Sequence, residues 1–96
     1  MTLHEDAKLL TEAQRRRLSE ILYCAIVEIR RLGWQGKSEQ TADLADAFHN
    51  LPQGMWLASF SLRSFRDGYL LAYQEKYPER FADYVAMVDE VMAMQD

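Results

Sequence analysis

The chain has 96 residues, with 11 Lys and Arg against 15 Asp and Glu, and its formal net charge is −4. Hydrophobic residues make up 49% of it, which is too high a share for a disordered chain. Its length fits one domain rather than two. The single Cys excludes an intramolecular disulfide framework, and no apolar run is long enough to span a membrane. We therefore expect one soluble, acidic domain over residues 1–96.

Residues 11–32 carry the strongest helical pattern in the chain. Apolar side chains recur at spacings of three and four, which places them on one helix face: Leu18, Leu22, Ala25, Ile29 and Leu32. Ile21 and Ile26 are expected to widen this apolar face. Thr11 and Gln14 have the spacing of a capping box at the start of the helix. Gly33 is the residue expected to end it in a left-handed conformation.

A short second helix is predicted over residues 39–50, with Ser38 as its N-cap. One face of this helix is largely apolar and includes Thr41, Leu44, Ala45, Phe48 and Leu51. Residues 51–60 fit two structures, a loop or a turn of helix that begins at Pro52.

A third helix is predicted over residues 61–77, capped by Ser61. Gly68 interrupts it, and a glycine at that point indicates a close helix crossing. Pro78 disfavours helical geometry in the residue before it and suits the first position of the next helix. The final helix is therefore expected to begin at Pro78 and to run to about residue 94.

The predicted fold is all-α. No segment shows the strict alternation of a strand, and the connections between the helices are short. We expect a compact antiparallel bundle of about four helices. Residues 1–10 are expected to add a frayed N-terminal turn from which Leu9 and Leu10 reach the core.

Charge is distributed unevenly along the chain. Residues 1–37 carry a net charge of +2, and residues 38–96 carry −6. An acidic region repels a phosphate backbone and attracts a basic protein, so we expect a protein partner and no nucleic acid. The N-terminal sequence MTLHEDAKLL has neither the basic nor the apolar region of a signal peptide, which favours the cytoplasm.

The stretch LADAFHN, residues 44–50, resembles the LADRLHN-type stretch of the HD-domain phosphohydrolases related to guanosine-polyphosphate hydrolases. The resemblance covers seven residues and implies that Asp46 would be a metal ligand. That family also needs an upstream histidine and an adjacent His-Asp pair on other helices. Here the only other histidine is His4, and the chain contains no His-Asp dipeptide.

Asp43, Asp46 and His49 are spaced three residues apart, so successive members lie near one another on the second helix. Neighbouring pairs could reach one ion, but a closed metal site needs four ligands. The alternative interpretation is a solvated acidic face with a histidine near the helix C-terminus. We expect these residues to contribute to binding rather than to hold a metal.

Trp34 and Trp56 lie in predicted connections, at opposite ends of the expected bundle. Loops on a rigid scaffold often carry function, and Trp is favoured at the centre of binding interfaces. Each Trp could instead close one end of the bundle as a plug. Cys24 lies beside the apolar face of the first helix and is expected to be an unreactive packing residue.

The sequence contains no nucleophile elbow, phosphate-binding loop or dinucleotide-binding motif, so we expect no catalytic residues and no cofactor. The leading hypothesis is a non-catalytic protein-binding module, either an inhibitor of the immunity-protein type or an adaptor, which acts on a basic partner. One alternative is a metal-dependent domain related to the HD phosphohydrolases. Another is a self-associating structural protein, or a homodimer, that pairs through methionines of the last helix: Met87, Met92 and Met94.

Overall fold

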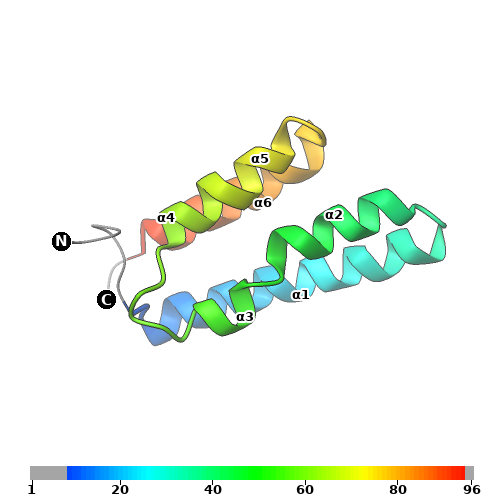
Figure 1. Cartoon of the computed structure of the whole chain (residues 1–96). Helices are drawn as coiled ribbons and strands as arrows, with labels where there is room; N and C mark the ends of the chain where they lie inside the picture. The colour runs from blue at the N-terminus through cyan, green and yellow to red at the C-terminus, as the bar shows by residue number, and fades with distance from the viewer. Residues whose placement is uncertain (1–8, 95–96) are drawn as a thin grey trace.

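The computed structural model describes residues 9–94, and helices make up most of that stretch (Figure 1). The first helix, α1, spans Glu12–Trp34. The predicted turn over residues 1–10 lies mostly outside the described residues. Of the two leucines expected to reach the core, Leu10 is buried, whereas Leu9 is exposed.

The predicted capping box at the start of α1 is confirmed. The Thr11 hydroxyl accepts a hydrogen bond from the Gln14 backbone N–H at 3.1 Å. The Gln14 side chain in turn accepts one from the Thr11 backbone N–H at 3.0 Å. Gln14 is itself buried, and its Nε2 donates to the Val91 carbonyl oxygen at 3.0 Å. The cap therefore also fixes the start of α1 against the end of the last helix.

The predicted end of α1 was wrong: the helix ends at Trp34, two residues beyond the predicted Leu32, and the left-handed residue is Gly36 rather than Gly33. Gly33 is helical, and Gly36 takes the left-handed conformation, with φ of 75°. The Gly36 N–H donates to the Gly33 carbonyl, and the Lys37 N–H donates to the Leu32 carbonyl at 3.0 Å. This is the hydrogen-bond pattern of a Schellman motif centred on Gly36. Trp34 is consequently the last residue of α1 and does not lie in a connection.

The second helix, α2, spans Ser38–Phe48 and is followed by a single helical turn, α3, over Leu51–Gly54. Ser38 is thus the first helical residue, and the predicted N-cap position belongs to Lys37, which makes no side-chain cap. The buried side of α2 also differs from the prediction, because Ala47 is buried and Ala45 is exposed.

The third predicted helix is continuous but irregular. It consists of α4 (Leu62–Phe65), a π-helical segment η1 (Arg66–Leu70) and α5 (Leu71–Gln74). Ser61 caps it as predicted and accepts a hydrogen bond from the Ser64 N–H at 3.1 Å. Gly68 lies within η1, and nothing outside the helix comes within 4 Å of the position a side chain would take. The predicted close crossing at Gly68 was therefore wrong.

The last helix, α6, spans Pro78–Met92, with Pro78 in its first turn as predicted. Its buried face carries Phe81, Tyr84, Val88 and Val91. The three methionines through which a second copy was hypothesised to pair are partly buried against the core: Met87, Met92 and Met94.

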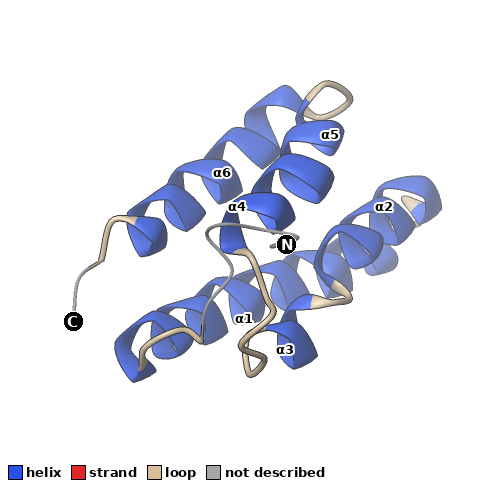
Figure 2. Cartoon of the chain, turned by 60° about the vertical axis from the view of Figure 1, so that its left-hand side comes forward, coloured by secondary structure: helices blue, strands red, loops and turns tan. Residues whose placement is uncertain are grey.

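The helices form two antiparallel pairs, α1 with α2 and α4–α5 with α6, which lie side by side and are inclined to one another (Figures 1 and 2). Helix α1 packs on α2 and on α6, and α5 packs on α6. Edge-on contacts of Phe48 with Phe65, at 5.7 Å between ring centroids, and with Tyr84, at 5.1 Å, join α2, α4 and α6. The fold is a compact all-α bundle, as predicted, and residues 9–94 contain no strand. Among those residues, no helix is long and apolar enough to cross a membrane.

Candidate functional site: an acidic face bound internally and an exposed apolar face

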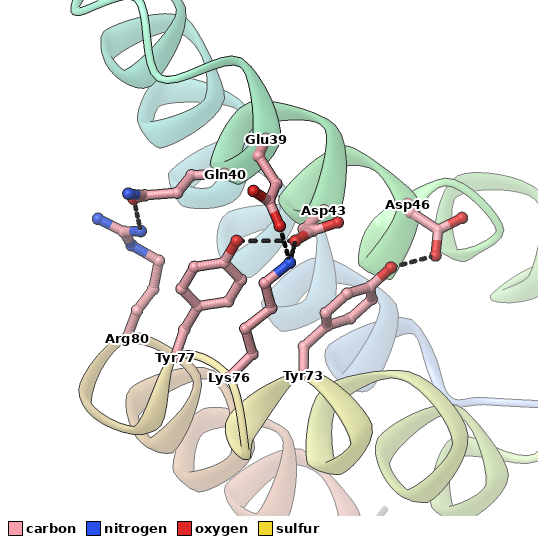
Figure 3. A network of polar contacts seen from close by, with 8 residues as sticks. All are labelled: Glu39, Gln40, Asp43, Asp46, Tyr73, Lys76, Tyr77 and Arg80. Carbon is pink, nitrogen blue, oxygen red and sulfur yellow. Dashed lines mark hydrogen bonds and ion pairs between the residues drawn. The ribbon is translucent and has the colours of Figure 1, made fainter.

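The acidic face of α2 is turned toward α5 rather than fully toward solvent (Figure 3). Asp43 accepts hydrogen bonds from the Tyr77 hydroxyl at 2.7 Å and from the Lys76 ammonium at 2.9 Å. Asp46 accepts one from the Tyr73 hydroxyl at 2.8 Å. Helix α5 and the turn after it therefore supply donors to both carboxylates.

Further polar contacts extend this network along the helices. Lys76 also pairs with Glu39 at the start of α2. Arg80 donates to the Gln40 side chain at 3.0 Å and pairs with Glu28 of α1 at 2.9 Å. Long side chains thus connect α2 with the α5–α6 turn, and Arg80 connects both of them to α1.

The network shifts the protonation of its members in consistent directions. Hydrogen bonds from Lys76 and then Tyr77 lower the pKa of Asp43. The hydrogen bond that the Tyr73 hydroxyl donates to Asp46 raises the pKa of Tyr73 to about 12. Hydrogen bonds to Glu39 and Asp43 likewise raise the pKa of Lys76. Each shift favours the protonation state in which the network is intact.

His49 lies at the C-terminal end of this face. Its Nδ1 lies 2.7 Å from the Asp46 carbonyl oxygen and 3.8 Å from the Asp46 carboxylate. The imidazole edge also packs against Tyr69, with 5.9 Å between ring centroids. Asp46 and His49 remain about half exposed, whereas the Asp43 side chain is only 19% exposed. The face is therefore only partly the solvated surface of the alternative interpretation.

Asp43, Asp46 and His49, the three residues considered for a metal site, are not arranged to share one ligand position. Asp46, the ligand implied by the HD resemblance, is bonded to Tyr73. Residues 9–94 contain no group of three or more His, Cys, Asp or Glu side chains arranged to hold a metal ion.

The two tryptophans lie on the surface in separate places. Trp34 is 76% exposed and Trp56 is 62% exposed, so the plug interpretation was wrong for both. The Arg30 guanidinium stacks over Trp34 at 4.0 Å, and that of Arg15 stacks over Trp56 at 4.6 Å. The two arginines are fifteen residues apart on α1, or about 22 Å along its axis. The tryptophans therefore mark two distinct surfaces, as the sequence suggested.

Trp34 belongs to a longer exposed apolar surface that the sequence analysis missed. Four large side chains on α1 are between 46% and 76% exposed: Tyr23, Ile26, Val27 and Trp34. At 3.6 residues per turn they fall within an arc of about 100° on the side of the helix opposite Leu18, Ile21, Ala25 and Leu32. We call these four residues the α1 outer stripe. Ile26 was predicted to face the core and faces solvent instead, because it belongs to this second apolar set.

A shallow groove with a volume of about 600 Å³ runs beside the α1 outer stripe, between α1 and α6. Tyr23 and Val27 line its α1 side, and Glu79, Asp83 and Met87 line its α6 side. Cys24 also lines the groove and is exposed, which corrects its predicted burial. It lies between the core face and the outer stripe, next to the gap between the two helices.

Comparisons with known proteins find nothing similar to this chain: no family model, no curated protein and no solved structure matches it. The resemblance to the HD phosphohydrolases therefore rests on residues 44–50 alone. Any functional assignment must come from the surfaces described above.

Proposed function

We propose that this protein is a non-catalytic binding module that docks a protein partner on the α1 outer stripe. The observation that carries the proposal is the exposure of four large side chains on one helix face: Tyr23, Ile26 and Val27 lie within about one turn, and Trp34 lies two turns further on beyond Arg30, which stacks on it. Single exposed apolar residues are ordinary, but contiguous ones indicate an interaction site.

The stripe is not needed to hold the bundle together. Leu18, Ile21 and Ala25 on the opposite face of α1 are fully buried and join the core. The stripe instead supplies two aromatic side chains, Tyr23 and Trp34, of the kinds that dominate binding energy in protein interfaces. Arg30, which stacks on Trp34, adds a third residue type favoured there.

The charge that favours a basic partner, as an inhibitor or an adaptor would have, lies in residues 38–96, which carry −6, and not on α1, since residues 1–37 carry +2. Opposite charge accelerates encounter and discriminates between partners. Asp43 and Asp46, which the sequence suggested for this role, are engaged by α5 and by Lys76 and Tyr77 of the turn after it. We therefore assign the docking role to α1, and a bundle-bridging role to the acidic face of α2.

Site-specific photo-cross-linking in the producing cell tests this proposal. A benzophenone amino acid replaces Tyr23 in one variant and Leu71, an exposed leucine on α5, in a matched control. The proposal predicts a discrete adduct with another protein at position 23 and none at position 71. Equal labelling at both positions, no adduct at position 23, or an adduct only with a second copy of the chain would contradict it.

A further inference from the structure

The groove between α1 and α6 has two chemically different walls. The α1 wall is apolar where Tyr23 and Val27 line it, and both side chains are about half exposed or more. The α6 wall carries the carboxylates of Glu79 and Asp83. The two helices run antiparallel, as the Arg17–Glu90 pair at 3.9 Å and the Arg80–Glu28 pair at 2.9 Å show. The groove is therefore an elongated trough that follows both helices.

The carboxylates on the α6 wall are unusual in this protein because they lack partners. Among the described residues, every other Asp and Glu side chain except Glu75 has a hydrogen bond or an ion pair within the chain. Glu75, Glu79 and Asp83 have neither. Two of these three unpaired carboxylates line the same groove.

The cations beside the groove offset these carboxylates only in part. Arg31 and Arg80 also line it and both pair with the single carboxylate of Glu28, so the ionised side chains of the lining carry a net charge of −1. The groove therefore presents a net negative charge, with its two unpaired carboxylates on the α6 side and exposed apolar surface on the α1 side.

We infer that the occupant of this groove is an amphipathic helix of the partner protein, with an apolar face and a flank of Lys or Arg. This inference rests on the proposed function and specifies the partner segment. A helix suits a trough between two helices, where its apolar face can cover Tyr23 and Val27. Its basic flank then meets Glu79 and Asp83, which gain the ion pairs they lack in the free protein.

The probe is a fluorescent helical peptide of about five turns, with leucines on one face and lysines on the other. Two controls are an isomer whose rearranged sequence has no apolar face and a peptide in which glutamates replace the lysines. Fluorescence anisotropy at physiological salt measures binding. We expect the amphipathic lysine peptide to bind at least about tenfold more tightly than either control, a difference of about 1.4 kcal/mol.

Paired variants locate the binding to the groove. The double variant Glu79→Lys with Asp83→Lys should weaken binding of the lysine peptide at least tenfold. Glu75→Lys, compared with Asp83→Lys alone, is the matched control because Glu75 is also unpaired but lies outside the groove lining. Tyr23→Ser should weaken binding, and Leu71→Ser should not. If a lysine variant does not fold by circular dichroism, Glu79→Gln with Asp83→Asn replaces it.

Three results would overturn the inference: an equal loss for Glu75→Lys and Asp83→Lys, no loss for Tyr23→Ser, or equal binding of the glutamate peptide. The cross-link at position 23 separates this inference from the proposed function. An adduct whose linked segment is not a basic amphipathic helix contradicts the inference alone. Absence of any adduct contradicts both.

Discussion

Gly33 and Gly36 provide a direct test of where α1 ends, and so of whether Trp34 extends the α1 outer stripe. Gly33 is helical, and nothing lies within 4 Å of the position a β-carbon would occupy. Gly33→Ala should therefore stabilise the protein by about 0.5–1 kcal/mol, because alanine loses less backbone entropy in a helix. Gly36 has φ of 75°, so Gly36→Ala should cost about 1–2 kcal/mol.

The two variants should thus differ by about 2 kcal/mol in free energy of unfolding. For a domain of this size each kcal/mol shifts the Tm by roughly 4–8 °C, so the difference in Tm should be about 8–16 °C. Thermal unfolding followed by far-ultraviolet circular dichroism measures it, with the unsubstituted chain between the two. If Gly33→Ala lowers the Tm as much as Gly36→Ala, α1 ends at Gly33 and Trp34 leaves the stripe.

Further substitutions test the cap, the network and the two faces of α1. Gln14→Ala removes one half of the capping box and the buried bond to Val91, and should cost about 2 kcal/mol in urea unfolding, whereas the exposed Gln53→Ala should cost little. The pKa of Tyr73 rises from 10 in the unfolded chain to about 12 in the fold, so its contribution to stability is present below pH 10 and is lost as the pH rises toward 12. Tyr73→Phe should therefore reduce the loss of stability over that pH window, and an unchanged pH profile would refute the assigned bond to Asp46. Tyr23→Ser should change stability by less than about 0.5 kcal/mol, whereas Ile21→Ala on the buried face should cost about 2–5 kcal/mol.

Local chemistry made several elements predictable. The spacing of Thr11 and Gln14, the hydroxyl of Ser61 and the position of Pro78 each specify a helix start through contacts within a few residues. Helical periodicity indicated the all-α fold because it, too, depends only on residues that are close together in the sequence. Where two glycines compete for one helix end, local chemistry was not enough: Gly33 and Gly36 both fit, and the Leu32 to Lys37 hydrogen bond decides between them.

The functional surfaces depended on contacts that are distant in sequence. Asp43 and Asp46 find their partners 27 to 34 residues away, and helical spacing does not show which helix will face them. The exposure of Trp56 likewise depends on how the bundle packs. The α1 outer stripe did leave a signal, because Tyr23, Val27 and Trp34 repeat at helical spacing. It went unnoticed beside the stronger pattern of the core face, to which Ile26 was assigned.

The central claim is that the protein docks its partner on α1 rather than on the acidic face of α2. The most direct test is a two-dimensional ¹H–¹⁵N spectrum of the labelled chain, recorded alone and after addition of the partner protein that the cross-link at position 23 identifies. The two indole N–H groups report on Trp34 and Trp56 separately. The account predicts that the Trp34 indole signal and the backbone signals of residues 23–34 shift, while Trp56 and residues 43–49 do not. Shifts confined to residues 43–49 or to Trp56 would contradict it.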